Sequence, residues 1–208
     1  VQGEGGINIA AADFLRGLRR VCEEHGWLFM VDEVQCGVGR TGKWFAHQHA
    51  GVKPDVMTLA KGLGSGVPVG ACLTAGAATG VFKPGNHGST FGGNPLACVA
   101  ALTTLAVLEE DNLLTRAQSL GDRVRARLGE RLVGVAGVVD IRGSGLRIGI
   151  ELDRPGAALV AAGLEDGILI NVTAEKVIRL LPPLVMADAE ADELVDRIAT
   201  LVRRFLAD

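Results

Sequence analysis

An uninterrupted apolar run ends in two acidic residues at positions 27–33, which read Trp27-Leu-Phe-Met-Val-Asp-Glu33. A strand that is buried on both faces, as in a parallel sheet, has this composition. A second apolar run, Val56-Met-Thr-Leu-Ala60, ends just as abruptly at Lys61. If both runs are parallel strands of one sheet, Asp32 and Lys61 face the same crevice, at the edge where open α/β sheets bind ligands.

The flanking sequence extends these two runs into a predicted α/β domain. Residues 11–25 place their apolar side chains on one face of a helix. Residues 69–74 are a third strand candidate. Asn94 and Pro95 form a favourable helix start, because asparagine caps well and proline suits the first turn, and we expect this helix to end near Glu110. Helix and strands in this order predict an α/β sheet.

The second half of the chain has a different pattern, in which short strand candidates are separated by glycine-rich turns. We therefore predict two domains, residues 1–110 and 111–208, of which the second is a smaller α+β domain. Its predicted helices are 113–132, 157–165 and 189–206, and its predicted strands are 138–141, 146–152, 168–172 and 177–181.

Composition excludes several classes of protein. The 208 residues carry a net charge of −3, and nucleic-acid binding normally requires a basic surface. No apolar run reaches the roughly 18 residues of a membrane span. Four cysteines without a CxxC pair indicate a reduced, cytoplasmic protein. Because the chain opens with Val1 in the middle of a motif, we expect an N-terminal truncation, so the absence of a leader carries little weight.

Glycines flank Lys61 on its C-terminal side, in Lys61-Gly-Leu-Gly-Ser-Gly66. Glycine permits close backbone approach to a ligand, and a lysine that is desolvated there becomes a nucleophilic amine. The alternatives are a flexible loop beside a surface lysine and, for Asp32, the first solvated position after a strand. A dinucleotide-binding loop is disfavoured, because Val67 stands where the third glycine of GxGxxG is required.

Three further features carry weaker signals. The stretch His87-Gly-Ser-Thr-Phe-Gly-Gly-Asn94 has the hydroxyls, glycine amides and helix start of a phosphate cradle, although an ordinary turn has them too. His47 and His49 suggest a metal, but no third ligand is near, so we prefer a surface helix and no metal. Arg179 lies in a strand-like run and requires a carboxylate, from a structural ion pair or from a substrate.

Taken together, these segments resemble the class III aminotransferases, which depend on pyridoxal 5'-phosphate (PLP), and the match runs over essentially the whole chain. Within that family the chain is most similar to the acetylornithine aminotransferases. The implied fold is a fold type I transferase: the remainder of the large parallel-sheet domain and a small α+β C-terminal domain. The matching segments are Gln2-Gly-Glu-Gly-Gly6, Val31-Asp-Glu-Val-Gln35, Gly37-x-Gly-Arg-Thr-Gly42, Pro54-Asp55 with Ala60-Lys61-Gly62, Gly88-Ser-Thr-Phe-Gly-Gly-Asn-Pro95 and Arg142-Gly-x-Gly145.

The resemblance implies a role for each matching residue at the cofactor ring. Lys61 would form the Schiff base with PLP and then act as general base and acid in the proton shift. Asp32 would pair with the pyridinium nitrogen and keep the ring protonated. Val34 would pack on the ring face, and Gln35 would hydrogen-bond the ring hydroxyl.

The resemblance also implies a homodimer and a substrate switch. Ser89 and Thr90 would reach the cofactor phosphate of the neighbouring subunit. Glu4 would mask Arg179 while the far end of the amine donor reacts, and would then free it for the α-carboxylate of glutamate. Relatives carry a phosphate loop, a stacking aromatic residue and a substrate arginine upstream of the matched part, and this chain does not contain them.

The implied reaction transfers the terminal amino group of N-acetylornithine to 2-oxoglutarate, in arginine biosynthesis. Succinylornithine, ornithine or 4-aminobutyrate are alternative donors. A decarboxylase or aminomutase on the same scaffold, and a truncated chain that only dimerises or binds a partner, are alternatives of a different kind.

Overall fold

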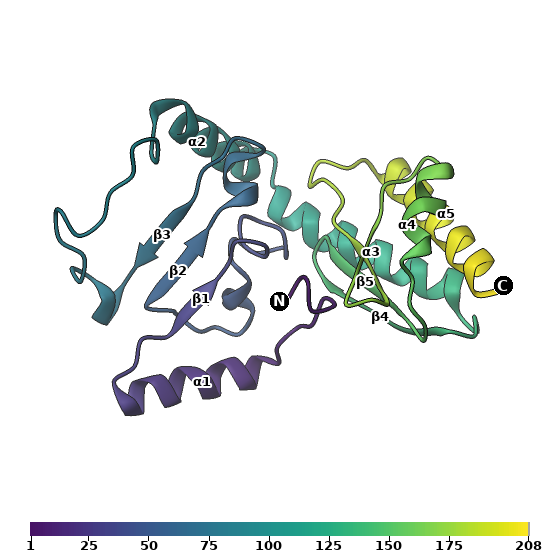
Figure 1. Cartoon of the computed structure of the whole chain (residues 1–208), viewed down its shortest axis with the longest axis horizontal. Helices are drawn as coiled ribbons and strands as arrows, with labels where there is room; N and C mark the ends of the chain where they lie inside the picture. Colours follow the sequence, from purple (N-terminus) through teal and green to yellow (C-terminus); the bar gives the residue numbers. More distant parts are fainter. Residues whose placement is uncertain (208) are drawn as a thin grey trace. The chain divides into compact units, whose positions relative to one another are not determined.

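The computed structural model describes residues 1–207 and divides the chain into two compact units (Figure 1). The Lys61 unit comprises Ala10–Leu114. The Arg179 unit comprises Val1–Ile9 together with the chain from Thr115 onward. The first nine residues belong to the same unit as the C-terminal half. They do so because Ile7 is fully buried against Gly149 of the Arg179 unit.

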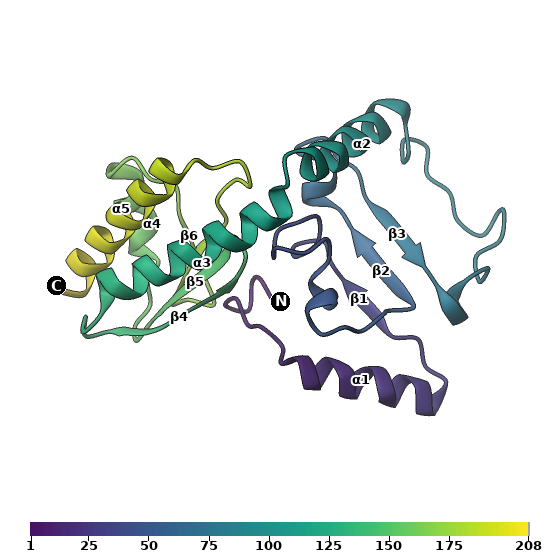
Figure 2. The ribbon, with the colours of Figure 1, turned by 180° about the vertical axis from the view of Figure 1, so that it is seen from behind.

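The Lys61 unit contains a three-stranded sheet in the order β1-β2-β3 (Figures 1 and 2). Strand β1 pairs parallel with β2, whereas β3 pairs antiparallel with β2, so the sheet is mixed. Asn94 caps α2 as expected, since its side chain accepts a hydrogen bond from the Ala97 amide at 3.0 Å. The elements are α1 (Ala12–His25), β1 (Met30–Asp32), η1 (Ala46–His49), β2 (Val56–Leu59), η2 (Lys61–Gly64), β3 (Ala71–Thr74), η3 (Gly76–Ala78) and α2 (Pro95–Glu110).

The expectation that residues 27–31 form a strand buried on both faces is wrong for the part of the chain described. Strand β1 begins only at Met30, whose exposure is 65%, and Trp27 is also exposed. In the described chain, β1 has one neighbouring strand, β2, and no helix or loop buries the side chains of Trp27 and Met30. Phe29 alone in this run is buried.

The Arg179 unit is α+β, as expected, with a four-stranded antiparallel sheet in the order β4-β5-β7-β6. Strand β6 is shorter and lies later in the chain than the expected strand at 168–172. The elements are α3 (Leu113–Leu132), which begins at the boundary of the two units, β4 (Val138–Ser144), β5 (Arg147–Leu152), α4 (Ala158–Glu165), β6 (Asn171–Thr173), β7 (Val177–Leu180) and α5 (Asp188–Ala207).

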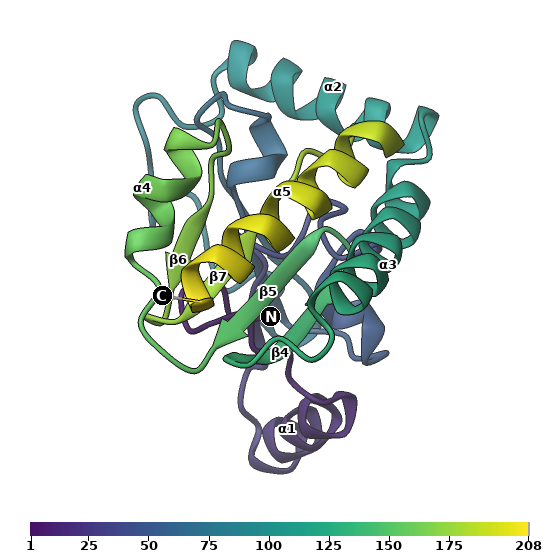
Figure 3. The ribbon, with the colours of Figure 1, turned by 90° about the vertical axis from the view of Figure 1, so that its right-hand side faces the viewer.

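One face of this sheet packs against α3 and α5 to form an apolar core (Figure 3). Ile148 and Ile150 of β5 and Ile178 of β7 are fully buried there. They alternate in sequence with residues of the opposite face, as the period of a strand requires. The helices contribute Leu120, Val124 and Leu128 from α3 and Val195, Ile198 and Val202 from α5.

A row of ion pairs joins α3 and α5 at the edge of this core. Asp192 of α5 binds Arg123 at 2.7 Å and also binds Arg127. Desolvation alone would raise the pKa of the Asp192 carboxyl, but the hydrogen bonds from these two guanidinium groups outweigh it and hold the pKa below its usual value. Asp188 and Asp196 continue the row along the same helix.

No helix within residues 1–207 combines the length and the apolar character that a membrane span requires.

The close approach of α3 to the β4–β5 turn predicts that Gly121→Ala destabilises the protein. A Cβ at Gly121 would lie 2.0 Å from the carbonyl oxygen of Gly145, which is backbone and cannot rotate away. Overpacking of this kind costs about 1–3 kcal/mol. Gly129→Ala in the same helix is the matched control, since its Cβ would meet nothing within 4 Å, and it should stabilise by roughly 0.5–1 kcal/mol. Urea unfolding measures both, and equal effects would contradict the packing.

The α3–α5 ion pairs predict a pH-dependent contribution from Asp192. Because its folded pKa lies below the unfolded value of about 3.9, the contribution is complete above that pH and is lost as the pH falls through the folded pKa. Asp192→Asn should therefore lower the free energy of unfolding at pH 7, and the difference from wild type should shrink below about pH 4. A difference that does not change between pH 7 and pH 3 in urea unfolding would refute this.

Candidate active site

Asp32 and Lys61 lie at the same end of two adjacent parallel strands. In the β1–β2 register Asp32 stands opposite Thr58, and β2 ends one residue later at Leu59. The chain then passes through Ala60 to Lys61. Both strands run in the same direction, so both side chains belong to the C-terminal edge of this sheet, and both are exposed. That these two side chains act together at a cofactor stays a prediction.

The backbone at Lys61 adopts an unusual conformation. Its φ is +46°, in the left-handed region that a non-glycine residue rarely adopts. Such residues persist only where the surroundings fix them, and they cluster at functional sites. Here Leu63 and Gly64 of the same short helix η2 are buried, and α2 packs against η2. The amine therefore stands at the exposed start of a well-anchored turn.

The turn that follows Asp32 is anchored by Glu33, a residue to which the sequence analysis gave no role. Its buried carboxylate accepts hydrogen bonds from the amides of Ala46 at 3.0 Å and His47 at 2.9 Å, and lies 3.1 Å from His47 Nδ1. A Cβ at Gly37 would lie only 2.9 Å from the Glu33 carbonyl oxygen. Glu33 thus closes the loop that leads from β1 to η1. In the sequence, its only indication is an acidic residue directly after the end of a strand.

His47 and His49 lie in η1, a short 3-10 helix, rather than in a longer surface helix. His47 is half-buried against Glu33, and His49 Nε2 lies 3.1 Å from the Thr41 carbonyl oxygen. Within residues 1–207, His, Cys, Asp and Glu side chains form no group of three that could hold a metal ion. Both rings thus contact groups of the loop between β1 and β2.

Two residues expected at the cofactor ring follow Asp32 directly. The Val34 amide donates to Asp32 Oδ1 at 2.8 Å, which fixes the carboxylate relative to the turn. Val34 and Gln35 are both half-buried. Asp32, Val34 and Gln35 therefore lie on one short turn at the edge that also carries Lys61.

Ser89 and Thr90 lie on an exposed segment that leads into α2. Ser89 Oγ accepts a hydrogen bond from the Gly92 amide at 2.9 Å, so the segment forms a tight turn. The neighbouring Phe91 has an exposure of 82%. No contact links these hydroxyls to Lys61 within the described chain, and their binding of phosphate stays a prediction.

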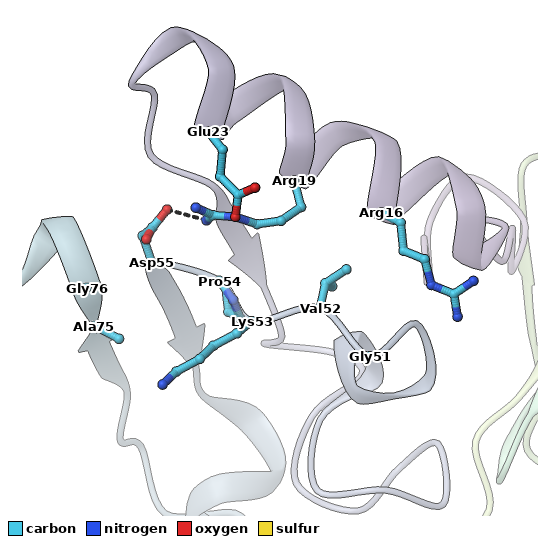
Figure 4. A pocket seen from close by; sticks show the side chains of 10 residues that line it. All are labelled: Arg16, Arg19, Glu23, Gly51, Val52, Lys53, Pro54, Asp55, Ala75 and Gly76. Carbon is cyan, nitrogen blue, oxygen red and sulfur yellow. Dashed lines mark hydrogen bonds and ion pairs between the residues drawn. The ribbon is translucent and has the colours of Figure 1, made fainter.

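A polar hollow lies at the opposite end of β2, between α1 and the loop that precedes the strand (Figure 4). Asp55 accepts from the Phe29 amide at 2.8 Å and pairs with Arg19 at 2.6 Å. The amide and the guanidinium hold the pKa of the Asp55 carboxyl below its usual value. This pair ties α1 to the start of β2, so we assign the Pro54-Asp55 motif to the structure of the unit.

The Arg179 unit contains the second expected pair. Arg179 Nη1 lies 2.5 Å from Glu4 Oε1. The arginine side chain is largely buried, with an exposure of 14%, whereas that of Glu4 is 71% exposed. The carboxylate that Arg179 was expected to require is thus Glu4, on the solvent side of the pair. Because Glu4 is exposed and Arg179 is shielded, another carboxylate can replace that of Glu4 at the guanidinium.

The donor set at the Lys61 edge fits a PLP ring. Asp32 and Lys61 form no ion pair with another residue of the described chain. A cationic ring nitrogen suits the carboxylate, and an aldehyde suits the amine. Residues 1–202 of the chain match the family model described as aminotransferase class-III.

The chain belongs to the class III aminotransferases. Over 205 residues it is 58% identical to the acetylornithine aminotransferase of Nitrosomonas europaea, covering 99% of this chain and 52% of that protein. The ornithine δ-aminotransferase structure of Plasmodium falciparum superposes with a TM-score of 0.94 at 36% identity, covering all of this chain and 54% of that one. The ornithine aminotransferase of Toxoplasma gondii, whose structure is described with PLP at the active site, has a TM-score of 0.92 and 40% identity, covering all of this chain and 50% of that one.

These similarities confirm the resemblance and the fold class that the sequence predicted. Class III aminotransferases are PLP-dependent, so the cofactor is the one expected. The chain spans about half the length of the relatives that it matches.

Proposed function

We propose that this class III aminotransferase transfers the terminal amino group of N-acetylornithine to 2-oxoglutarate, as a step of arginine biosynthesis in the cytoplasm. The observation that carries the proposal is the shared strand edge of Asp32 and Lys61, where an amine and a carboxylate stand without a competing ion pair in the described chain. The similarity to acetylornithine aminotransferases supports this donor. Similarity to ornithine aminotransferases supports the alternative that ornithine is the donor.

The residues at this edge have different proposed roles toward the cofactor. PLP, when bound, supplies a pyridinium ring that withdraws electrons from the substrate carbon. Asp32 would pair with the ring nitrogen and favour its protonated form, because an adjacent carboxylate stabilises a cation. The Lys61 amine would hold the cofactor and act as general base and acid for the substrate proton, a contribution of about 10²–10⁴-fold. Val34 would pack on the ring face, and Gln35 would hydrogen-bond the ring hydroxyl.

The phosphate group of the cofactor would be bound across a dimer interface. Ser89 and Thr90 would bind the cofactor phosphate of the neighbouring subunit in a homodimer. The adjoining helix α2 supports this, because it exposes Leu96, Val99 and Leu102 by 59–73%, and apolar patches of this kind mark interfaces. Sedimentation of the protein expressed from the intact gene measures its oligomeric state, and a monomer would count against the dimer.

Glu4 and Arg179 form a switch pair in this proposal. While they are paired, the arginine is neutralised and the amine donor presents its far end to the cofactor. When Glu4 moves away, Arg179 binds the α-carboxylate of glutamate. The exposure of Glu4 beside a shielded arginine supports this exchange.

Removing the Lys61 amine tests the cofactor assignment. In the protein expressed from the intact gene, Lys61→Ala should abolish borohydride-dependent labelling of the peptide that contains residue 61 and lower transamination by about 10²-fold or more. Asp32→Asn should keep the label and still lose most of its turnover. A Lys61→Ala variant that transaminates normally without added amine would refute the role of Lys61, and unchanged kinetics in Asp32→Asn would refute that of Asp32.

A panel of amine donors tests the substrate. With 2-oxoglutarate as acceptor, glutamate should form with the highest kcat/KM from N-acetylornithine, ahead of succinylornithine, ornithine and 4-aminobutyrate. A higher kcat/KM for ornithine would move the assignment to that donor while leaving the aminotransferase in place. If no donor yields glutamate, the catalytic proposal fails.

A further inference from the structure

The N-terminal residues that carry Glu4 form a closed loop. The Gln2 amide donates to the Asn8 carbonyl oxygen at 2.9 Å, and the Asn8 side chain donates to the Gly5 carbonyl oxygen at 2.7 Å. Glu4 lies inside this loop, flanked by glycines. Because the Glu4 side chain is long and mostly exposed, a loop with a fixed position lowers the entropic cost of holding its carboxylate over Arg179.

The strand register places the support for this loop on one face of the sheet. Arg142 of β4 stands opposite Gly149 of β5, Gly149 opposite Arg179 of β7, and Arg179 opposite Asn171 of β6. Directly opposite residues share a face, so these four form a row across all four strands. The alternate residues, such as Ile148 and Ile178, face the core beneath α3 and α5. The row therefore lies on the other face.

The Arg142 guanidinium fastens the loop at one end of this row. It donates from Nη2 to the Gly6 carbonyl oxygen at 2.6 Å and from Nε to the Ile7 carbonyl oxygen at 3.2 Å. Nη1 binds Glu151 at 2.6 Å and Asp140 at 3.0 Å. Since two carboxylates fix the guanidinium from the sheet side, its remaining donors present a rigid fork to the loop.

Thr173 and Ile7 complete the attachment. The Thr173 hydroxyl is buried and donates to the Glu4 carbonyl oxygen at 2.5 Å. Ile7 is fully buried over Gly149, where an added Cβ would lie 3.0 Å from the Ile7 Cβ. Glycine at this position of the row thus makes room for the loop between Arg142 and Arg179. Contacts from three strands hold the loop of residues 2–8, of which the one from Thr173 reaches the Glu4 backbone, and none of them involves the Glu4 carboxylate.

We propose that Arg142 and Thr173 are positioning residues that pin the Glu4 loop to the sheet and thereby set how readily Glu4 releases Arg179. The inference rests on the proposed switch role of Glu4 and Arg179. When the anchors are intact, only the side chain of Glu4 needs to move, and the pair reforms after each exchange. When an anchor is lost, the whole loop moves and the masked state is disfavoured.

The test separates the two half-reactions in the protein expressed from the intact gene and loaded with PLP. Thr173→Val removes the hydroxyl at nearly constant volume, and Arg142→Lys keeps the charge but loses the fork. Each should lower the KM for glutamate relative to that for the amine donor by about 2- to 10-fold, the factor of one net hydrogen bond, with kcat for glutamate little changed. Thr173→Ser, which retains the hydroxyl, should restore the wild-type ratio.

Hydrogen exchange of the peptide that covers residues 2–8 provides a readout that does not depend on activity. Its amides should exchange faster in Thr173→Val and in Arg142→Lys than in wild type and Thr173→Ser. A KM ratio within 2-fold of wild type, or unchanged exchange in Thr173→Val, overturns the proposal, and a parallel loss of both half-reactions does so as well. If wild type transaminates no donor, the proposed function fails, while the exchange measurement still decides whether these residues anchor the loop.

Discussion

The parallel pairing of β1 with β2 is the constraint on which the chemistry of this chain depends. Parallel strands end at the same edge, so the register that sets Asp32 opposite Thr58 also brings the turn after β1 beside the turn that begins at Lys61. An antiparallel pair would have sent the acid and the amine to opposite edges. The pairing therefore converts two sequence positions 29 residues apart into one local donor set.

The turns at this edge are held by groups that do not take part in the chemistry. Glu33 is buried and satisfied by amides of the loop that leads to η1, and Leu63 and Gly64 anchor η2. Asp32 and Lys61 are exposed, whereas Glu33, Leu63 and Gly64 are buried. A site arranged in this way can keep its geometry while its functional groups stay accessible.

The two faces of the sheet in the Arg179 unit have different roles. One face is apolar and packs beneath α3 and α5, which gives the unit its core. The other face carries a charged row that receives the chain's first residues, with Gly149 leaving the space that Ile7 occupies. A single antiparallel sheet thus stabilises the unit on one side and positions an acid over Arg179 on the other.

The sequence by itself determined the helices at 11–25, 95–110 and 113–132 and the family, because periodicity, capping and motif order are local properties of the chain. Only the tertiary structure decided that β1 is an exposed edge strand, that β3 runs antiparallel, that residues 1–9 belong with the C-terminal half, and that Arg142 and Thr173 hold Glu4. These features depend on which strands become neighbours and which face each side chain meets. Contacts across 169 residues, such as that of Thr173 with Glu4, leave no periodic trace in the sequence.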